Sequence, residues 1–264
     1  MEIIFKNVGL DGLSDGYVNR VIDDLSFEIK EKKITFILGK SGKSTILSLI
    51  NGDDIPSFGE VIVDGVKSVG FLRQNPEDYF FCNTIYEEIL FELKKRRIKC
   101  DYDKKIVNAL KMVGLDKTYL NRSPFEISKG GQKKVALAMI LACNPKLFIL
   151  DEPFTNLDYS SKKKIVKLFR MMKLRYGKTF IIATNDVDDA LELADEVICL
   201  NDGKLAFKGD KYDLFTNTKL LKQADIAKPK IIRFTDLVRD SKGIKLEYRD
   251  DINDLMKDIY RFVR

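Results

Sequence analysis

Short apolar runs alternate with segments of helical spacing along most of the chain. The run ITFIL at 34–38 lies between a charged stretch and a glycine, which is typical of a buried strand, and KSTILSLI at 43–50 has helical spacing. Three later apolar runs, separated by helical segments, predict further strands: KLFIL at 146–150, TFIIAT at 179–184 and EVICL at 196–200. This alternation predicts an α/β fold, with a parallel sheet and helices on both of its faces.

A long helical stretch interrupts these strands. Val61–Gly65 and Ser68–Leu72 predict two more strands, but from about 75 to 130 the apolar residues recur at spacings of three and four. We interpret 75–130 as a helical subdomain inserted into a domain that covers residues 1–210.

The end of the chain has a different pattern. The sequence NDGKLAFKGD predicts a hairpin with its turn at Asn201–Gly203. Residues 211–264 are charged and less regular, and we interpret them as a small C-terminal appendage.

Composition narrows the protein class. The 264 residues suffice for a sizeable core. The 46 basic and 40 acidic residues are spread along the chain, so the charge of the protein favours its attraction to phosphates or to an anionic membrane only weakly. The longest apolar stretch, Val135–Cys143, is about half the length of a membrane span, and the first ten residues lack the apolar run of a signal peptide. We therefore expect a soluble, cytoplasmic protein.

The chain contains no histidine, which excludes histidine zinc sites, serine-histidine triads and imidazole acid-base chemistry. Its four cysteines lack the close pairs of zinc or redox sites, so we expect reduced packing residues: Cys82, Cys100, Cys143 and Cys199. Catalysis must therefore depend on carboxylates, lysine and the backbone.

A glycine-rich stretch follows the strand at 34–38 and precedes a helix. Backbone N–H groups and a helix start can enclose a phosphate there, with Lys43 reaching the terminal phosphates and Ser44 binding Mg²⁺. The candidate ATP-binding residues are Gly39, Lys40, Ser41, Gly42, Lys43, Ser44 and Thr45. The pattern GxxGKST is two residues shorter than the usual GxxxxGK[ST], and alone it is also compatible with a glycine-rich turn.

Two acids follow the apolar run at 146–150. A buried strand would deliver Asp151 and Glu152 to the carboxyl edge of the sheet, where α/β proteins bind ligands. Asp151 is suited to a role at a bound Mg²⁺ ion, and Glu152 can polarise an attacking water. The alternative, a solvated acidic turn, is disfavoured because a phosphate loop precedes these acids in the chain.

The motifs together resemble a known family. LDEPFTNLD at 150–158 looks like the Walker B and D-loop block of ABC ATPases, the stretch at 126–153 resembles their signature helix and Walker B strand, and FLRQNPED at 71–78 resembles their Q-loop. The resemblance covers about residues 1–210. It implies a P-loop ABC-type nucleotide-binding domain that binds ATP and Mg²⁺ in a dimer. It also implies that Gln74 contacts Mg²⁺ and water and senses a membrane partner.

The signature departs from the family pattern LSGGQ, whose serine and amides bind the γ-phosphate held by the opposite subunit. Here the text is ISKGGQ, so the candidate residues are Ser128, Lys129, Gly130, Gly131 and Gln132. Either Lys129 replaces the first glycine, or the two glycines and Gln132 form the core with one residue lost after them. Ser128, Gly130 and Gly131 are candidates in both registers.

Two further positions differ from the family. The switch histidine falls on Asn185, which can donate a hydrogen bond to phosphate but cannot carry a positive charge, so hydrolysis should suffer more than binding. The aromatic residue that stacks on adenine is missing from residues 8–12, and Tyr17 is a substitute candidate.

Within the family, residues 74–93 and the tail at 208–229 are similar to energy-coupling factor and cobalt-type importer ATPases, whose C-terminal region serves pairing. This similarity implies an ATP-binding subunit at the cytoplasmic face of the membrane, driving uptake of a small solute such as a vitamin or metal ion. Its partners would be a second ATPase subunit, identical or not, and a transmembrane subunit.

Two alternatives remain open at this point. The altered loops are also compatible with a degenerate partner subunit that binds nucleotide but hydrolyses little of it. A soluble, non-transport ABC ATPase acting on DNA or ribosomes is less favoured, because the chain has one cassette, no long coiled-coil insertion and no basic tract. We therefore expect no nucleic-acid partner.

Overall fold

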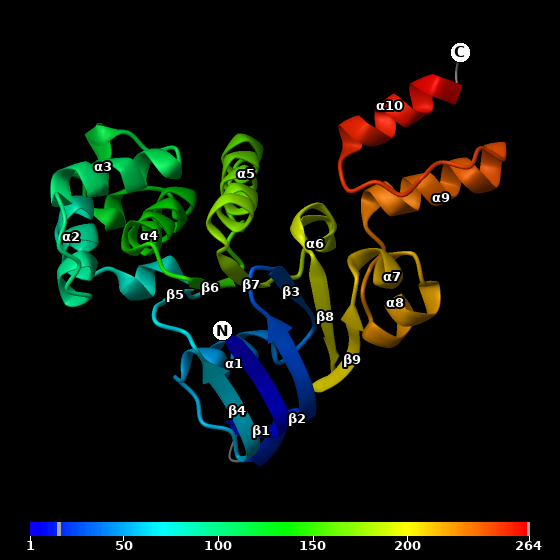
Figure 1. The fold of residues 1–264 in the computed structure, drawn as a ribbon, viewed down its shortest axis with the longest axis horizontal. Coiled ribbons are helices and arrows are strands. Elements are labelled where there is room, and N and C mark those ends of the chain that lie inside the picture. Colours follow the sequence, from blue (N-terminus) through cyan, green and yellow to red (C-terminus); the bar gives the residue numbers. More distant parts are fainter. Residues whose placement is uncertain (15–16, 263–264) are drawn as a thin grey trace. The chain divides into compact units, whose positions relative to one another are not determined.

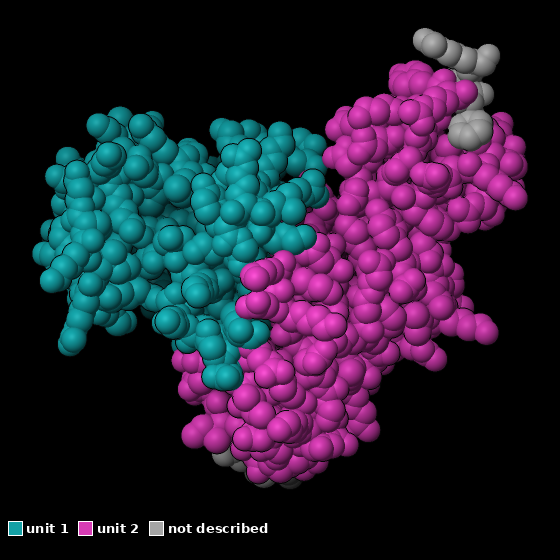
Figure 2. Space-filling model, in the orientation of Figure 1, with its two compact units in different colours: residues 1, 64–182 teal, residues 2–63, 183–264 magenta. Residues whose placement is uncertain are grey.

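The computed structural model describes residues 1–14 and 17–262, without the side chains of residues 13, 14, 17, 18 and 262. The chain forms two compact units, coloured separately in Figure 2: residues 1 and 64–182 make up the first, and residues 2–63 and 183–264 the second. Figure 1 labels the helices and strands of both. The helices of the predicted insertion lie in the first unit.

The second unit begins with an antiparallel sheet of order β2-β1-β4, formed by β2 (Tyr17–Lys30), β1 (Glu2–Ser14) and β4 (Phe58–Asp64). Phe5 and Phe27 lie opposite each other in the β1–β2 ladder and stack with ring centroids 4.5 Å apart. The sequence reading found β4 as a strand but missed β1 and β2. Three register shifts interrupt this ladder between Phe5 and Asp11, whereas residues 25–30 alternate between buried and exposed.

The other strands of the second unit carry the predicted strand-loop-helix segment. The buried strand β3 (Ile34–Gly39) pairs in parallel with β8 (Glu196–Asn201) and is followed by α1 (Lys43–Asn51). The helix α6 (Val187–Leu193) precedes β8. The predicted hairpin is confirmed, because β8 pairs antiparallel with β9 (Lys204–Gly209) and Asn201 lies opposite Lys204.

In the first unit, β5 (Val69–Leu72) and β6 (Leu147–Asp151) pair in parallel, and β7 (Thr179–Ala183) follows β6 in the strand order. Phe148 of β6 stacks on Phe180 of β7, with ring centroids 4.6 Å apart. The helical spacing predicted within 75–130 is confirmed by α2 and α3. The helical elements of this unit are η1 (Pro76–Tyr79), α2 (Ile85–Lys95), α3 (Tyr102–Met112), η2 (Lys117–Tyr119), η3 (Pro124–Glu126), α4 (Lys129–Cys143) and α5 (Tyr159–Tyr176).

Residues 211–262 are more regular than the sequence indicated. They form four helices: α7 (Lys211–Phe215), α8 (Thr218–Ala224), α9 (Lys230–Lys242) and α10 (Ile252–Phe262). Lys211 anchors this segment, since its ammonium lies 2.8 Å from the carbonyl oxygen of Leu191 and 2.8 Å from a carboxylate oxygen of Asp250. Across the described residues, every helix is too short or too polar to traverse a bilayer.

Candidate functional site

The phosphate-loop candidate has two glycines that the backbone requires. Gly39 ends β3 with φ of +129°, and Gly42 precedes α1 with φ of +83°. A Cβ atom at Gly39 would lie 2.2 Å from the carbonyl oxygen of Leu200, and one at Gly42 would lie 2.8 Å from Cδ1 of Ile22. Both ends of the short loop are therefore held by close packing, and only Lys40 and Ser41 lie between them.

The start of α1 offers backbone donors. The first bond within the helix runs from the N–H of Ile46 to the carbonyl of Gly42, at 2.9 Å. The N–H groups of Lys43, Ser44 and Thr45 precede that bond and lie in the first helical turn, where the helix dipole favours an anion. This arrangement suits a phosphate group.

The ammonium group of Lys43 links this loop to Asn185. Lys43 is buried, with 8% of the residue exposed, and its Nζ donates to the carbonyl of Gly39 and to Oδ1 of Asn185 at 2.8 Å. The backbone N–H of Thr184 donates to the carbonyl of Ile37 in β3, at 3.2 Å. The second unit thus brings together the loop lysine and the residue predicted to replace the switch histidine.

A small cavity adjoins the loop within the second unit. Its volume is about 110 Å³, and it is lined by Leu38, Gly39, Lys40, Thr184, Asn185, Val187, Asp225, Ile226 and Ala227. Lys40 forms an ion pair with Asp225, and that hydrogen bond raises the pKa of the Lys40 ammonium. Sequence reasoning missed Asp225, because nothing local distinguishes it from the other acids of the tail.

The two predicted carboxylates lie in the first unit, at the end of β6. All five residues of this strand are buried, and Asp151 is only 5% exposed. Glu152 is half-buried and has φ of +46°, a left-handed conformation that is uncommon for a residue with a side chain and is often found at functional sites. The hydroxyl of Thr155 donates to Oε2 of Glu152 at 3.4 Å.

The Q-loop candidate is held by its backbone. Gln74 is exposed and lies between β5 and η1. Its carbonyl oxygen accepts a hydrogen bond from Nζ of Lys133 at 2.7 Å. The Tyr79 hydroxyl donates to the carbonyl of Phe71 at 3.1 Å and accepts from the N–H of Arg73. The segment around Gln74 is therefore fixed while its side chain faces solvent.

Lys133 is a buried cation that sequence reasoning missed. It belongs to α4 and is 1% exposed. Burial lowers the pKa of its ammonium, and the negative charges of Asp151 and Glu152 act in the opposite direction. The structure thus adds a positive charge to the surroundings of the two carboxylates.

The signature candidate forms the N-terminus of α4. Ser128 is the N-cap, and its hydroxyl accepts from the N–H of Gly131 at 3.2 Å. A Cβ atom at Gly130 would lie 2.4 Å from the carbonyl oxygen of Asn156, so this glycine permits close packing on the segment after β6. Lys129 is the first residue of this helix, directly after the capping serine.

The other two signature candidates with long side chains, Lys129 and Gln132, differ in exposure. Lys129 is exposed and forms an ion pair with Glu77. Gln132 is buried, with 5% exposed, and its Nε2 donates to the carbonyl of Pro124 at 3.0 Å. The Gln132 side chain therefore faces the interior of the first unit.

Comparison with known proteins now adds to this geometry. The family model for ABC transporters matches residues 22–155. The energy-coupling factor transporter ATP-binding protein EcfA1 of Mycoplasma mobile is 36% identical over 83% of this chain and 84% of its own length. EcfA2 of Mycoplasma capricolum is 32% identical over 91% of this chain and 92% of its own length. This chain belongs to the energy-coupling factor ATP-binding proteins of the ABC transporter family.

A solved structure supports the fold of this ATP-binding protein. The dimeric structure of an ATP-binding cassette in a post-hydrolysis state, bound to ADP and Pi, is similar with a TM-score of 0.73 and 27% identity. The similarity covers 79% of this chain and 98% of that one. The predicted P-loop ABC-type α/β fold and the assignment as an ABC-type ATPase are confirmed.

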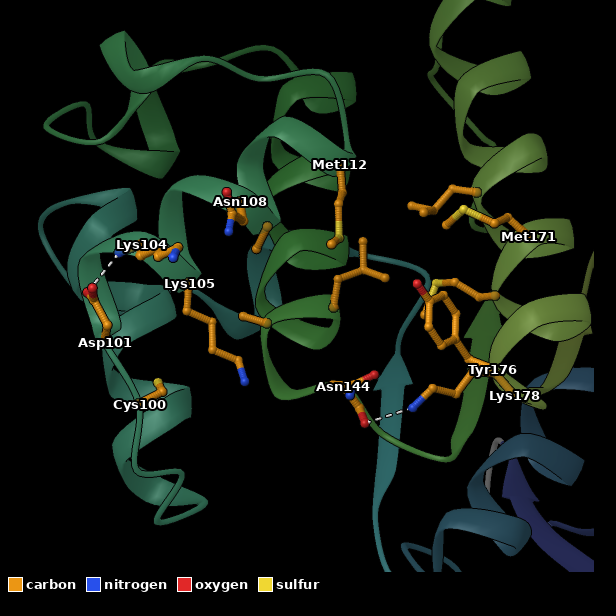
Figure 3. A pocket seen from close by; sticks show the side chains of 15 residues that line it. Cys100, Asp101, Lys104, Lys105, Asn108, Met112, Asn144, Met171, Tyr176 and Lys178 are labelled. Carbon is orange, nitrogen blue, oxygen red and sulfur yellow. Dashed lines mark hydrogen bonds between the residues drawn. The ribbon is translucent and has the colours of Figure 1, made fainter.

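Two features of the cassette lie apart from these motifs. Tyr17, the adenine candidate, begins β2, but its side chain lies outside what the structure describes. A groove of about 640 Å³ lies among α3, α4 and α5 in the first unit (Figure 3), and the described residues that line it include none of the nucleotide candidates. At its edge, the Lys178 ammonium donates to the carbonyls of Asn144 at 3.1 Å and Pro145 at 2.8 Å.

The four cysteines of the cassette are free. Burial raises the pKa of the Cys199 thiol to about 12 and that of Cys143 to about 11. Both therefore remain protonated at neutral pH and act as small packing groups.

Proposed function

We propose that this chain binds Mg-ATP and drives the uptake of a small solute, such as a vitamin or metal ion, through a transmembrane partner at the cytoplasmic face of the membrane. The observation that carries the proposal is the buried Lys43 ammonium at the start of α1, which donates a hydrogen bond to Asn185. The backbone N–H groups of the first turn of α1 lie at the same end of the helix and point away from its later turns. The names of the relatives support the same role, since they are ATP-binding proteins of energy-coupling factor transporters.

Nucleotide binding begins with an exchange of partners at Lys43. In this structure its ammonium binds the Gly39 carbonyl and the Asn185 amide oxygen. A terminal phosphate would replace these neutral acceptors with charged oxygens, which form stronger hydrogen bonds. The exposed Lys40 and Ser41 and the N–H groups at the start of α1 supply further donors.

The candidate metal ligands fit Mg²⁺ by their chemistry. Ser44, Gln74 and Asp151 offer hydroxyl, amide and carboxylate oxygens, which are hard ligands of the kind that Mg²⁺ prefers. Among the described residues, no group of three or more acidic or cysteine side chains could hold a metal ion alone. This agrees with an ion held mainly by substrate phosphates, as is usual for Mg²⁺. Bound Mg²⁺ would neutralise charge on the phosphates.

Hydrolysis is assigned to the groups at the end of β6. We assign Glu152 to orient and polarise the attacking water, and its left-handed backbone sets the direction in which its side chain leaves the strand. The exposed Gln74 side chain would help to hold a bound Mg²⁺ and the attacking water. Asn185 donates its amide to the γ-phosphate once Lys43 has turned to the nucleotide.

A second ATP-binding subunit completes the site. The exposed first turn of α4, with Ser128, Gly131 and the Lys129 ammonium, binds the γ-phosphate held by that subunit. Gln132 contributes by fixing this turn to the carbonyl of Pro124, since its side chain is buried. The similar cassette described above is dimeric, which supports the arrangement.

We further propose that residues 1–210 act as the ATPase domain and that residues 211–264 take part in pairing. The C-terminal helices α9 and α10 expose large apolar side chains, among them Phe234, Leu237 and Ile252. Such side chains are suited to an interface.

A degenerate partner subunit is the second candidate function. It is favoured by the short loop between Gly39 and Gly42 and by asparagine in place of the switch histidine. In that case the chain would bind nucleotide and complete the site of a different subunit, while its own site turned over slowly.

Copurification and titration test these proposals. The full chain, expressed in its native host and extracted with the membrane fraction, should copurify with a transmembrane subunit and a second ATP-binding chain. Isothermal titration of the purified chain should show ATP binding that weakens when Mg²⁺ is removed by EDTA. Absence of binding with Mg²⁺ present would contradict the main proposal, and binding without turnover in the assembled complex would favour the degenerate partner.

A further inference from the structure

Two lysines of the signature helix α4 contact the segment around Gln74. Lys129 and Lys133 are four residues apart, so they lie on the same face of the helix, one turn from each other. Lys133 donates to the carbonyl of Gln74 at 2.7 Å, and Lys129 forms an ion pair with Glu77. We define residues 73–79 as the Q segment.

The Q segment combines exposed residues with a few points of contact. Within it, Gln74, Asn75, Glu77 and Asp78 are exposed. The Tyr79 hydroxyl bonds backbone groups of Phe71 and Arg73 and so closes the segment on itself, and Pro76 is buried. The lysines of α4 supply polar contacts that join the segment to the signature helix.

The two lysines contribute differently. The Lys129–Glu77 pair is exposed, with side chains 57% and 43% accessible, and such pairs are weak and screened by salt. Lys133 is 1% exposed, and its hydrogen bond to a carbonyl forms where water competes little. Lys133 is therefore the stronger contact, and Lys129 adds an outer ion pair at the start of the helix.

Lys133 also has a charge relationship with the end of β6. The negative charges of Asp151 and Glu152 oppose the effect of burial on the pKa of its ammonium. One side chain thereby bonds the backbone of Gln74 and interacts electrostatically with the two acids.

We propose that Lys129 and Lys133 clamp the Q segment to the signature helix, and that Lys133 is a positioning residue for hydrolysis in its own subunit. The catalytic part of this inference rests on the proposed function. The first turn of α4 is assigned to the nucleotide of the second subunit, so a shift of that turn moves the Q segment of this subunit with it. The clamp gives one route by which filling one site changes the other.

The clamp is tested on the purified chain without nucleotide, by hydrogen exchange of the amides at 73–80. Lys133→Met keeps an apolar chain of similar length in the helix but removes the donor, and it should speed exchange there by about 10- to 100-fold. Lys134→Met is the matched control, because Lys134 is the next residue of α4 and lies 3.7 Å from Asp158, outside the Q segment. It should leave exchange at 73–80 unchanged. Equal exchange in Lys133→Met and the unmodified chain would overturn the clamp.

A charge exchange tests the outer contact and does not alter the buried lysine. Glu77→Lys and Lys129→Glu should each speed exchange at 73–80 about two- to fivefold. The double variant restores an ion pair of reversed polarity and should return exchange to within about twofold of the unmodified chain. Additive effects in the double variant would remove Lys129 from the clamp.

The catalytic role is measured in the assembled complex. Lys133→Met should lower kcat about 10- to 100-fold and change KM for ATP less than about threefold, while Lys133→Arg should recover part of kcat. An unchanged kcat in an active complex would overturn the positioning role of Lys133. If the unmodified complex shows no hydrolysis, the proposed function fails together with that role, and the exchange experiments still decide whether the clamp exists.

Discussion

Nζ of Lys43 lies 2.8 Å from Oδ1 of Asn185, so the lysine of the predicted phosphate loop is bound to the residue that we predict to replace the switch histidine of the family. An asparagine offers a carbonyl oxygen to the lysine and an amide N–H₂ to a phosphate at the same time. The pair therefore holds the lysine in the loop before nucleotide arrives. It also explains how a chain without histidine keeps a polar group at this position.

Asn185→His should raise turnover of the assembled complex by about tenfold. Removal of one transition-state donor costs about 10²- to 10³-fold in other enzymes, and the asparagine amide recovers only part of that. The ammonium of Lys43 disfavours a protonated imidazole, so the neutral ring would accept from Lys43 and donate to phosphate. Turnover is measured with the second subunit's own site inactivated, which assigns it to this chain.

Asn185→Ala is the matched control for that prediction. It should lower turnover while leaving ATP affinity unchanged or slightly higher, because Lys43 loses a competing acceptor. If both variants turn over ATP like the unmodified chain, the position does not contact the γ-phosphate.

Asp225→Asn should strengthen ATP binding about two- to fivefold. Asp225 lines the cavity at the loop and pairs with Lys40, so its carboxylate competes with a phosphate for that lysine. The pair is exposed, which limits the effect to the range of surface ion pairs. Titration at low and high salt measures it, and the gain should shrink with salt. Asp213→Asn, at another acid of the tail, should leave affinity unchanged.

Local pattern was sufficient for the segments that carry the loop and the carboxylates. The runs at 34–38 and 146–150 are mostly apolar and are followed by a glycine and an acid, so both strands could be predicted from the sequence. The hairpin at Asn201–Gly203 could also be predicted, because turn residues separate two strand patterns. Each of these features depends on neighbours within a few residues.

Contacts between distant segments could not be predicted in this way. In the sequence, Lys133 resembles the other lysines of a helical segment. Gln74, Asp151 and Glu152 come close to it only in the folded unit. Asp225 is separated from Lys40 by most of the chain. The strands β1 and β2 were missed although residues 25–30 alternate between buried apolar and exposed polar residues.

Glu152→Gln should keep ATP binding and stop turnover. The amide has nearly the same shape as the carboxylate but cannot polarise water, and Thr155 can still bond its oxygen. The assembled complex should lose at least about 100-fold in kcat, while titration gives an unchanged Kd. An unchanged rate of hydrolysis, with the second subunit's site inactivated, would refute the assigned role.

Restoring two residues between Ser41 and Gly42 should tighten Mg-ATP binding. The present loop has two residues between its glycines, and the usual pattern has four, so up to two backbone donors are missing around the phosphates. A hydrogen bond to a charged group contributes about 1.5 to 3 kcal/mol, so each restored donor should strengthen affinity about 10- to 100-fold.

The structure allows this insertion, because Gly39 and Gly42 keep their separate anchors on Leu200 and Ile22 while the exposed residues between them bulge into solvent. Two residues inserted after the exposed Asp54 serve as the control and should not change affinity. The restored loop combined with Lys43→Ala should bind far more weakly than the restored loop alone, since the added donors act on a phosphate that Lys43 holds. Equal and tight binding by the unmodified and restored chains would show that two residues already supply the donors that the phosphates need.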